Sequence, residues 1–196
     1  MTSNTASIRA LPIVRSVTGA TAQSKAWLII AAVGLLTLSA KVQIPLWPVP
    51  ITMQTYVVLV IGMGYGTRLG LLAVGSYIAL GALGMPVFAG TPAQGIGMPY
   101  LLGPTGGYLI GFLVAAGVCG MLAEKGWDRK LSTSLAAMAL GHALIFACGI
   151  AWLATLVGFE RAIELGFAPF IFGTVLKTAL AAVSLPVAWK WRDRSN

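Results

Sequence analysis

Two side chains that can carry a positive charge lie inside long apolar stretches of this sequence. Lys177 stands within GTVLKTALAA, and His142 stands between Gly141 and Ala143. An ammonium placed in hydrocarbon costs about 2.5–3.5 kcal/mol on insertion scales, so a lysine kept there is expected to bind a partner. We therefore expect Lys177 to meet an anionic or hydrogen-bonding substrate in an outward cavity. The alternative is that its ammonium snorkels to the outer interface. His142 is expected to be neutral, packed and bonded to a nearby carbonyl.

Several kinds of chemistry are missing from the sequence. It contains no G-x-x-x-x-G-K-[ST] motif, so the chain is not expected to hydrolyse ATP. It has no cysteine and histidine cluster with metal-ligand spacing, and we expect no metal, no cofactor and no catalytic residue. Ion-coupled transporters usually place carboxylates within their spans. The five acidic residues here lie at the edges of the apolar stretches or between them, so the energy for transport is expected to come from a partner.

The composition predicts an all-α polytopic membrane protein, a compact bundle of six transmembrane helices. Of its 196 residues, 58% are hydrophobic and 9% are charged, whereas a soluble domain carries about 25% charged residues. The second and third apolar stretches are short and flank the turn Gly66-Thr67-Arg68, which predicts a helical hairpin. The six stretches are residues 27–40, 54–65, 69–84, 106–123, 135–158 and 167–189.

The distribution of lysine and arginine predicts that both termini are cytoplasmic. We expect a cytoplasmic N-terminal segment (1–26), a six-helix membrane domain (27–190) and a cytoplasmic tail (191–196). The first 25 residues have no apolar core, which argues against a cleaved signal peptide. This orientation places ten of the thirteen basic residues inside: Arg9, Arg15, Lys25, Arg68, Lys125, Arg129, Lys130, Lys190, Arg192 and Arg194.

Two segments between the predicted spans are rich in proline and yet apolar. Residues 41–53 read KVQIPLWPVPITM, and residues 85–105 read MPVFAGTPAQGIGMPYLLGPT, with no charged residue in the second segment. Proline and glycine disfavour helix, so neither segment is expected to be helical. Irregular backbone near a membrane must be buried or line a site, so we expect both loops to fold back and cap a cavity. The alternative is a pair of stiff interfacial connectors with aromatic anchors.

Glycines recur four residues apart in two of the predicted spans. Gly62, Gly66 and Gly70 follow each other through the hairpin, and Gly107 and Gly111 begin the fourth stretch. Small residues at this spacing allow helix backbones to approach closely in lipid. We expect either tight packing of these helices or a docking face.

Three runs of this sequence together resemble the BioY family, the biotin-specific substrate-capture components of energy-coupling-factor transporters. They are IPLWPVPITMQT (44–55), GMPVFAGTPAQGIGMPYLLGPTGGYLIGF (84–112) and GFAPFIFGTVLKTALAA (166–182). The resemblance covers residues 27–189. It implies high-affinity biotin capture by a bundle in the bacterial cytoplasmic (inner) membrane, with the pocket near the outer face beneath the two loops. It also implies a transmembrane coupling protein and two ATPase subunits as partners, which alone use ATP.

The resemblance also implies a set of substrate-binding residues. Lys177 matches the lysine of a family pattern that reads roughly G-D-x-x-K, and Thr174 stands where the pattern has its acid. A threonine hydroxyl in place of a carboxylate loses on the order of 1–2 kcal/mol, and the biotin carboxylate or a loop carbonyl is expected to replace the missing counterion of Lys177. The other candidates are apolar walls and close-approaching backbone: Trp47, Phe88, Tyr100 and Tyr108, then Gly90 to Gln94, Gly106 and Gly107.

Other functions remain as alternatives. The same architecture could bind a biotin precursor or another vitamin such as thiamine or riboflavin. An intramembrane enzyme using His142 with Ser76 or Ser184 lacks a G-x-S-x-G elbow and a supporting acid. An autonomous secondary transporter is disfavoured by the missing membrane carboxylates.

Overall fold

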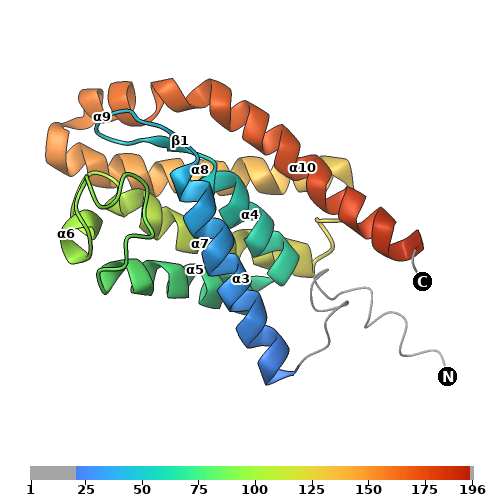
Figure 1. Ribbon diagram of the computed structural model, residues 1–196. Helices are drawn as coiled ribbons and strands as arrows, with labels where there is room; N and C mark the ends of the chain where they lie inside the picture. Colours follow the sequence, from blue (N-terminus) through green and yellow to red (C-terminus); the bar gives the residue numbers. More distant parts are fainter. Residues whose placement is uncertain (1–20, 195–196) are drawn as a thin grey trace.

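The computed structural model describes residues 21–194 of the chain. Residues 1–20 and 195–196 lie outside the described part, and with them Arg9 and Arg15 of the orientation argument and most of the expected N-terminal segment. Figure 1 shows the order of the elements along the chain. These are α3 (Ala22–Lys41), β1 (Gln43–Ile44), β2 (Ile51–Thr52), α4 (Gln54–Tyr65), α5 (Thr67–Ala82), α6 (Met98–Leu101), α7 (Gly106–Glu124), α8 (Leu131–Val157), α9 (Phe159–Gly166), the 3-10 turn η1 (Ala168–Phe170) and α10 (Ile171–Arg194).

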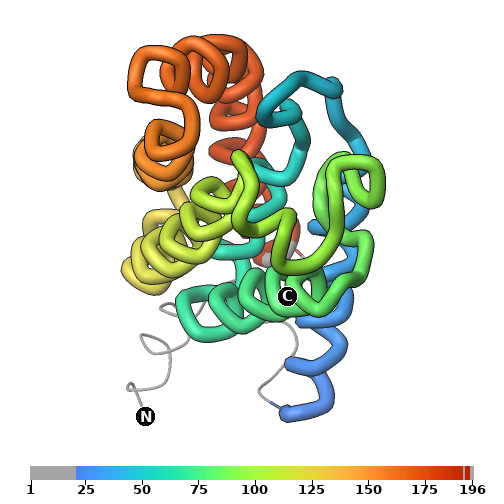
Figure 2. The backbone as a smooth tube through the Cα atoms, turned by 90° about the vertical axis from the view of Figure 1, so that its left-hand side faces the viewer, coloured from blue at the N-terminus to red at the C-terminus, as the bar shows by residue number. Residues whose placement is uncertain are grey.

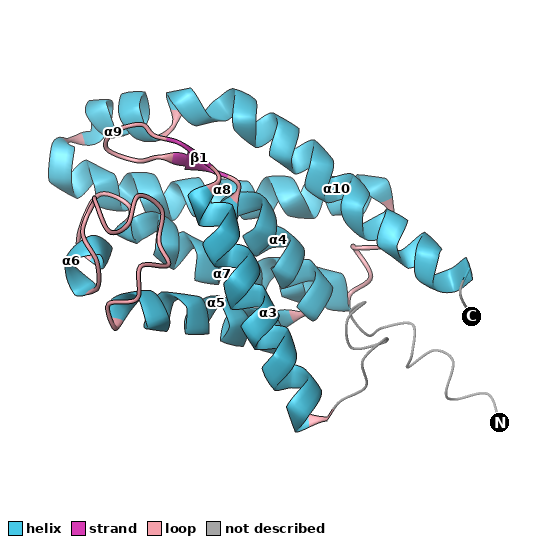
Figure 3. Cartoon of the chain, viewed as in Figure 1, coloured by secondary structure: helices cyan, strands magenta, loops and turns pink. Residues whose placement is uncertain are grey.

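Helix dominates the structure, and each of the six predicted apolar stretches is helical (Figure 3). Within the described residues, four helical segments are long and apolar enough to cross a membrane, and α4 and α5 are shorter apolar helices. The four are Ala22–Lys41, Gly106–Glu124, Leu131–Val157 and Phe159–Trp191. The predicted hairpin is present, because α4 and α5 are joined at Gly66, whose φ of 79° suits glycine.

The helix α7 is the most buried of the four candidate spans. Glycines at its contacts allow the backbones of α4 and α8 to approach it closely. A methyl group added at Gly62 of α4 would lie 2.8 Å from the Cα atom of Ala116 in α7. One added at Gly111 of α7 would lie 2.8 Å from the Cα atom of Ile145 in α8. Both distances are shorter than real carbon contacts, so the tight packing predicted from the glycine spacing is confirmed.

The two proline-rich loops lie beside each other at one end of the bundle (Figure 2). The first loop is held by a short antiparallel hairpin, in which Gln43 pairs with Thr52 and Ile44 with Ile51. The second loop contains the single helical turn α6, so the prediction that neither loop is helical was wrong at residues 98–101. Pro99 is tolerated there because it occupies the first turn, where a backbone N–H has no partner to lose.

The segment between α8 and α10 also differs from the prediction. Residues 167–189 are predicted to form one stretch, but η1 precedes α10, which begins only at Ile171. The helix α9 was missed, because its charged residues Glu160, Arg161 and Glu164 interrupt the apolar pattern. Only one side of α9 faces the bundle, through the buried Ala162 and Gly166.

Candidate functional site

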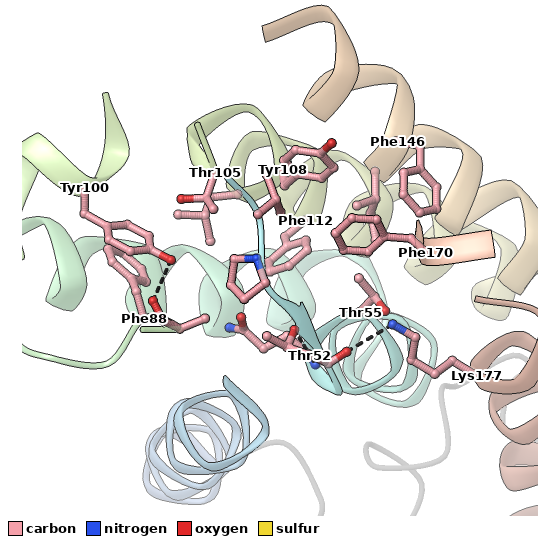
Figure 4. Close-up of a pocket in the computed structure, with 16 residues that line it drawn as sticks. Thr52, Thr55, Phe88, Tyr100, Thr105, Tyr108, Phe112, Phe146, Phe170 and Lys177 are labelled. Atoms are coloured by element: carbon pink, nitrogen blue, oxygen red, sulfur yellow. Dashed lines mark hydrogen bonds between the residues drawn. The ribbon is translucent and has the colours of Figure 1, made fainter. Parts of the chain in front are cut away.

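A cavity lies beneath the two loops and is lined by residues of the loops and of α4, α7, α8 and α10 (Figure 4). Apolar and aromatic side chains form most of its wall: Val49, Pro50, Phe88, Ala89, Tyr100, Tyr108, Leu109, Phe112, Ile145, Phe146 and Phe170. The remaining lining residues are polar: Thr52, Gln54, Thr55, Thr105 and Lys177.

Lys177 of α10 is buried, with 6% of its surface exposed, and it lines this cavity. Its Nζ donates a hydrogen bond to the carbonyl oxygen of Thr52 at 3.0 Å (Figure 4). The ammonium therefore does not snorkel to the interface, and a loop carbonyl takes the place of a counterion. Because an ammonium carries three N–H donors, it can bind the oxygen of a ligand beside Thr52.

One wall of the cavity is built from stacked aromatic rings of the second loop. Phe88 and Tyr100 stack with ring centroids 4.8 Å apart, and Tyr77 of α5 packs edge-on against Phe88 at 5.4 Å. The Tyr100 hydroxyl donates to the carbonyl oxygen of Ala89 at 2.8 Å. Burial raises the pKa of the Tyr100 phenol, so it stays neutral and keeps this bond. The wall is thus rigid and flat, which suits a planar ligand.

The opposite wall is also aromatic. Tyr108 of α7 packs edge-on against Phe146 of α8 at 6.4 Å, and Phe146 packs against Phe170 of η1 at 6.0 Å. The Tyr108 hydroxyl donates to the carbonyl oxygen of Gly166 at 2.8 Å. This bond ties α7 to the end of α9, so the missed helix helps to position the wall.

The second loop is anchored to the helices below it by two sets of hydrogen bonds. The Nε2 of Gln54 donates to the Tyr77 hydroxyl at 2.7 Å, and that hydroxyl donates to the carbonyl oxygen of Val87 at 3.0 Å. Lys41, at the end of α3, donates to the carbonyl oxygens of Phe88 at 2.9 Å and Thr91 at 3.0 Å, and to the Thr91 hydroxyl at 2.9 Å. The loop is therefore held at Val87 to Thr91, next to the ring that lines the cavity.

Replacing Lys41 by methionine is expected to loosen the second loop. All three donors of the ammonium would be lost, and a segment with fewer bonds opens more often. We expect amide hydrogen exchange across residues 87–94 to rise severalfold, measured by mass spectrometry on the purified chain. Lys25→Met, at an exposed site at the other end of α3, is the matched control and should leave that exchange unchanged. Equal exchange in the two variants would rule out the anchoring role.

A second hollow lies outside the first and is bounded by the two loops. Tyr100 and Thr105 line both hollows, so they stand between the outer one and the inner cavity. Trp47 lines the outer hollow and is 76% exposed, and Gln94 lines it as well. These two candidates therefore lie outside the inner cavity and border the outer hollow.

Three of the candidate glycines serve loop geometry and packing. Gly90 has a φ of +69°, a backbone conformation that favours glycine. A side chain at Gly106 would collide with the carbonyl oxygen of Leu101, and one at Gly107 would collide with Trp152 of α8. None of the three lines the cavity, so direct contact with a substrate stays a prediction for them.

Thr174 and His142 lie together, away from the cavity lining. Both border an apolar groove between α8 and α10, which also contains Thr178. The Nδ1 of His142 lies 3.1 Å from the carbonyl oxygen of Met138 and 2.9 Å from the Thr178 hydroxyl. The predicted bond from His142 to a nearby carbonyl is confirmed. Thr174 and Lys177 line different hollows although they are three residues apart on α10.

Four of the ten residues predicted to bind substrate line the cavity: Phe88, Tyr100, Tyr108 and Lys177. The polar lining residues of β2 and of the first turn of α4 were not predicted, although the run IPLWPVPITMQT contains them. A signal was present, because Thr52, Gln54 and Thr55 are polar residues directly beside an apolar, proline-rich loop that was expected to cap a site. The aromatic residues Phe112, Phe146 and Phe170 carried no such signal, since their types are ordinary in any apolar helix.

A family comparison decides where this chain belongs. The model of the BioY family matches residues 12–194, nearly the whole chain. The chain belongs to the BioY family. Among its curated relatives, the probable biotin transporter BioY of Pyrococcus horikoshii is 40% identical over 151 residues, which are 77% of this chain and 87% of the relative. The biotin transporter BioY of Thermotoga maritima is 40% identical over 150 residues, 76% of this BioY-family chain and 86% of the relative.

A solved structure shares the fold of this BioY-family chain. It is the crystal structure at 2.1 Å of the S-component for biotin from an ECF-type ABC transporter, and it aligns with a TM-score of 0.74 and 24% sequence identity. The alignment covers 88% of this chain and 95% of the other. At this identity the likeness shows the fold alone.

Proposed function

We propose that this chain captures biotin with high affinity and is the substrate-binding component of an ATP-driven vitamin transporter. Family membership supports biotin uptake, since relatives of about 40% identity are named as biotin transporters. The observation that carries the proposal at the level of the site is the capped aromatic cavity with the buried Lys177 at one end. A bound substrate, with no cofactor or metal of the chain's own, accounts for this arrangement.

The chemistry of the cavity suits the parts of biotin. Biotin has a flat ureido ring fused to an apolar thiophane, and a valerate chain that ends in a carboxylate. The stacked rings of Phe88 and Tyr100 offer a flat apolar surface, and Lys177 offers a cation for the carboxylate. Binding sites of this kind combine apolar walls with a few fixed polar groups. We place the carboxylate at Lys177 and the ring system between the aromatic walls.

The energy for uptake is proposed to come from partner proteins. The sequence has no phosphate-binding motif, and the chain shares its fold with the S-component of an ECF-type ABC transporter. On this proposal a transmembrane coupling protein and two ATPase subunits complete the transporter, and the chain itself is not an enzyme. The partners alone bind and hydrolyse ATP.

Uptake by cells tests this division of labour. Expression of the chain with a coupling protein and ATPases is expected to restore growth of a biotin auxotroph on trace biotin. An ATPase variant whose phosphate-binding lysine is replaced is expected to abolish that growth. Uptake that persists without ATPase activity and collapses with an uncoupler, while ATP is maintained, would instead indicate an autonomous secondary transporter.

The proposed topology has six spans with both termini in the cytoplasm, as a multi-pass protein of the bacterial inner membrane. The basic residues between spans support this orientation. In a background without Cys119 and Cys148, an impermeant maleimide should label Ile96→Cys in intact cells. It should label Lys125→Cys only after permeabilisation, because that loop is cytoplasmic. The reverse pattern would invert the orientation.

A biotin precursor is the second candidate ligand, because Thr174 replaces the acid of the family pattern. Desthiobiotin differs from biotin by lacking the thiophane sulfur, so competition between the two reports how the ring end is recognised. We expect biotin to be preferred. Preference for desthiobiotin, thiamine or riboflavin would change the assigned ligand and keep the architecture.

A further inference from the structure

One polar side chain of the cavity wall has no hydrogen-bond partner within the described part of the chain. The Oγ1 atom of Thr55, in the first turn of α4, is buried and unpaired, and Thr55 lines the cavity. Burying a hydroxyl without a partner is unfavourable. Thr67 and Ser134 also have buried, unpaired hydroxyls, but neither lines the cavity. Thr55 is therefore placed where a bound molecule can supply the missing partner.

Local geometry explains why this hydroxyl is unpaired. A hydroxyl in a helix usually donates to the carbonyl three or four residues before it. Thr37 does so to Val33 at 2.8 Å, and Ser184 does so to Leu180 at 2.7 Å. For Thr55 the residues three and four positions earlier, Thr52 and Ile51, belong to the strand β2, so no preceding helical turn presents a carbonyl to this hydroxyl.

The hydrogen bond of Lys177 brings the hydroxyl and the ammonium to one end of the cavity. The ammonium of Lys177 is bonded to the carbonyl oxygen of Thr52, and Thr52 lies three residues before Thr55 in the chain. Figure 4 shows the side chains of Thr55 and Lys177 at this end, facing the space between the aromatic walls. A neutral O–H donor beside a cation suits a carboxylate, which accepts one bond from each with its two oxygens.

We infer that Thr55 is a substrate-binding residue whose hydroxyl donates a hydrogen bond to the carboxylate that Lys177 neutralises. The inference rests on the proposed function, since the carboxylate is that of biotin. The ligand-free protein carries the cost of an unpaired buried hydroxyl, and the bound ligand removes it. A site built in this way discriminates against molecules that lack the matching acceptor, because the polar group then stays unpaired.

The test is Thr55→Val, which keeps the shape of the side chain and removes the hydroxyl. We expect biotin affinity, measured by calorimetry on the purified full chain, to fall about tenfold, as for the loss of one hydrogen bond to a charged group. The thermal unfolding midpoint without ligand should stay equal or rise, because an unpaired polar group has been removed. Thr55→Ser is the matched control, and it should bind biotin within about threefold of the unaltered chain, since it keeps the hydroxyl.

Biotinol, which carries an alcohol in place of the carboxylate, tests whether the Thr55 hydroxyl contacts the carboxylate end of the ligand. Thr55→Val should weaken biotinol binding by less than about threefold, because a bond between neutral groups is weaker. Equal losses for biotin and biotinol would assign the hydroxyl to another part of the ligand and overturn the inference. Unchanged biotin affinity, or a lower unfolding midpoint without rescue by serine, would overturn it as well. If the unaltered chain does not bind biotin, the proposed function itself fails, and the first titration shows this before any variant is made.

Discussion

Lys177→Met is expected to weaken biotin binding by roughly a hundredfold. Hydrogen bonds to charged groups contribute about 1.5–3 kcal/mol each, and about 2.8 kcal/mol corresponds to a hundredfold change in affinity. Methionine has a similar length and keeps the packing of the wall, so the loss reports the charge and its donors. Lys177 is the cationic side chain in the cavity lining, and the ligand carboxylate would be left without an ion partner.

Lys190→Met is the control for this change, because Lys190 lies exposed on the same helix. It should bind biotin as the unaltered chain does. Lys177→Arg should recover only part of the affinity, since the longer, planar guanidinium does not fit a site shaped for an ammonium. If Lys177→Met bound biotin with unchanged affinity, the carboxylate would have to lie elsewhere in the cavity.

Gly111→Ala is expected to lower the free energy of unfolding by about 1–3 kcal/mol, the usual cost of overpacking. The added methyl group would lie 2.8 Å from the Cα atom and 3.0 Å from the carbonyl oxygen of Ile145. These are backbone atoms of α8, so α7 and α8 would have to move apart. Because Tyr108 and Phe146 lie on these two helices, biotin affinity should fall as well.

Gly34→Ala provides a matched comparison, because a methyl group there meets no atom within 4 Å. Replacing glycine in a helix by alanine stabilises it by about 0.5–1 kcal/mol when nothing is crowded. Thermal unfolding in detergent should therefore show opposite shifts for the two variants. Equal shifts would contradict the close approach of α7 and α8.

The helices and the capping loops were predictable because they follow from patterns along the chain. Apolar runs located the helices, and proline-rich segments that remained apolar indicated loops folded over a site. Lys177 was predictable as well, since an ammonium inside an apolar run needs a compensating contact. The helix α9 was not, because its charged residues hide a short helix that packs on one side only.

The face that each residue presents was less predictable. Thr174 and Lys177 are three positions apart, which is a rotation of about 300° around the helix axis. Their side chains therefore point in directions about 60° apart. That rotation places them on either side of the contact between α8 and α10, so they line different hollows. The role of Thr55 depends on its position near Lys177, whose ammonium is bonded to the carbonyl oxygen of Thr52. Such a relation joins residues 52 and 177, and no local pattern contains it.

Titration of the purified, detergent-solubilised chain with biotin, followed by calorimetry, tests the central claim most directly. The account predicts saturable binding of one biotin per chain with roughly nanomolar affinity, about −12 kcal/mol. It also predicts that Lys177→Met removes most of this affinity and that Lys190→Met removes none. No heat of binding with biotin, together with saturable binding of desthiobiotin, thiamine or riboflavin, would contradict it.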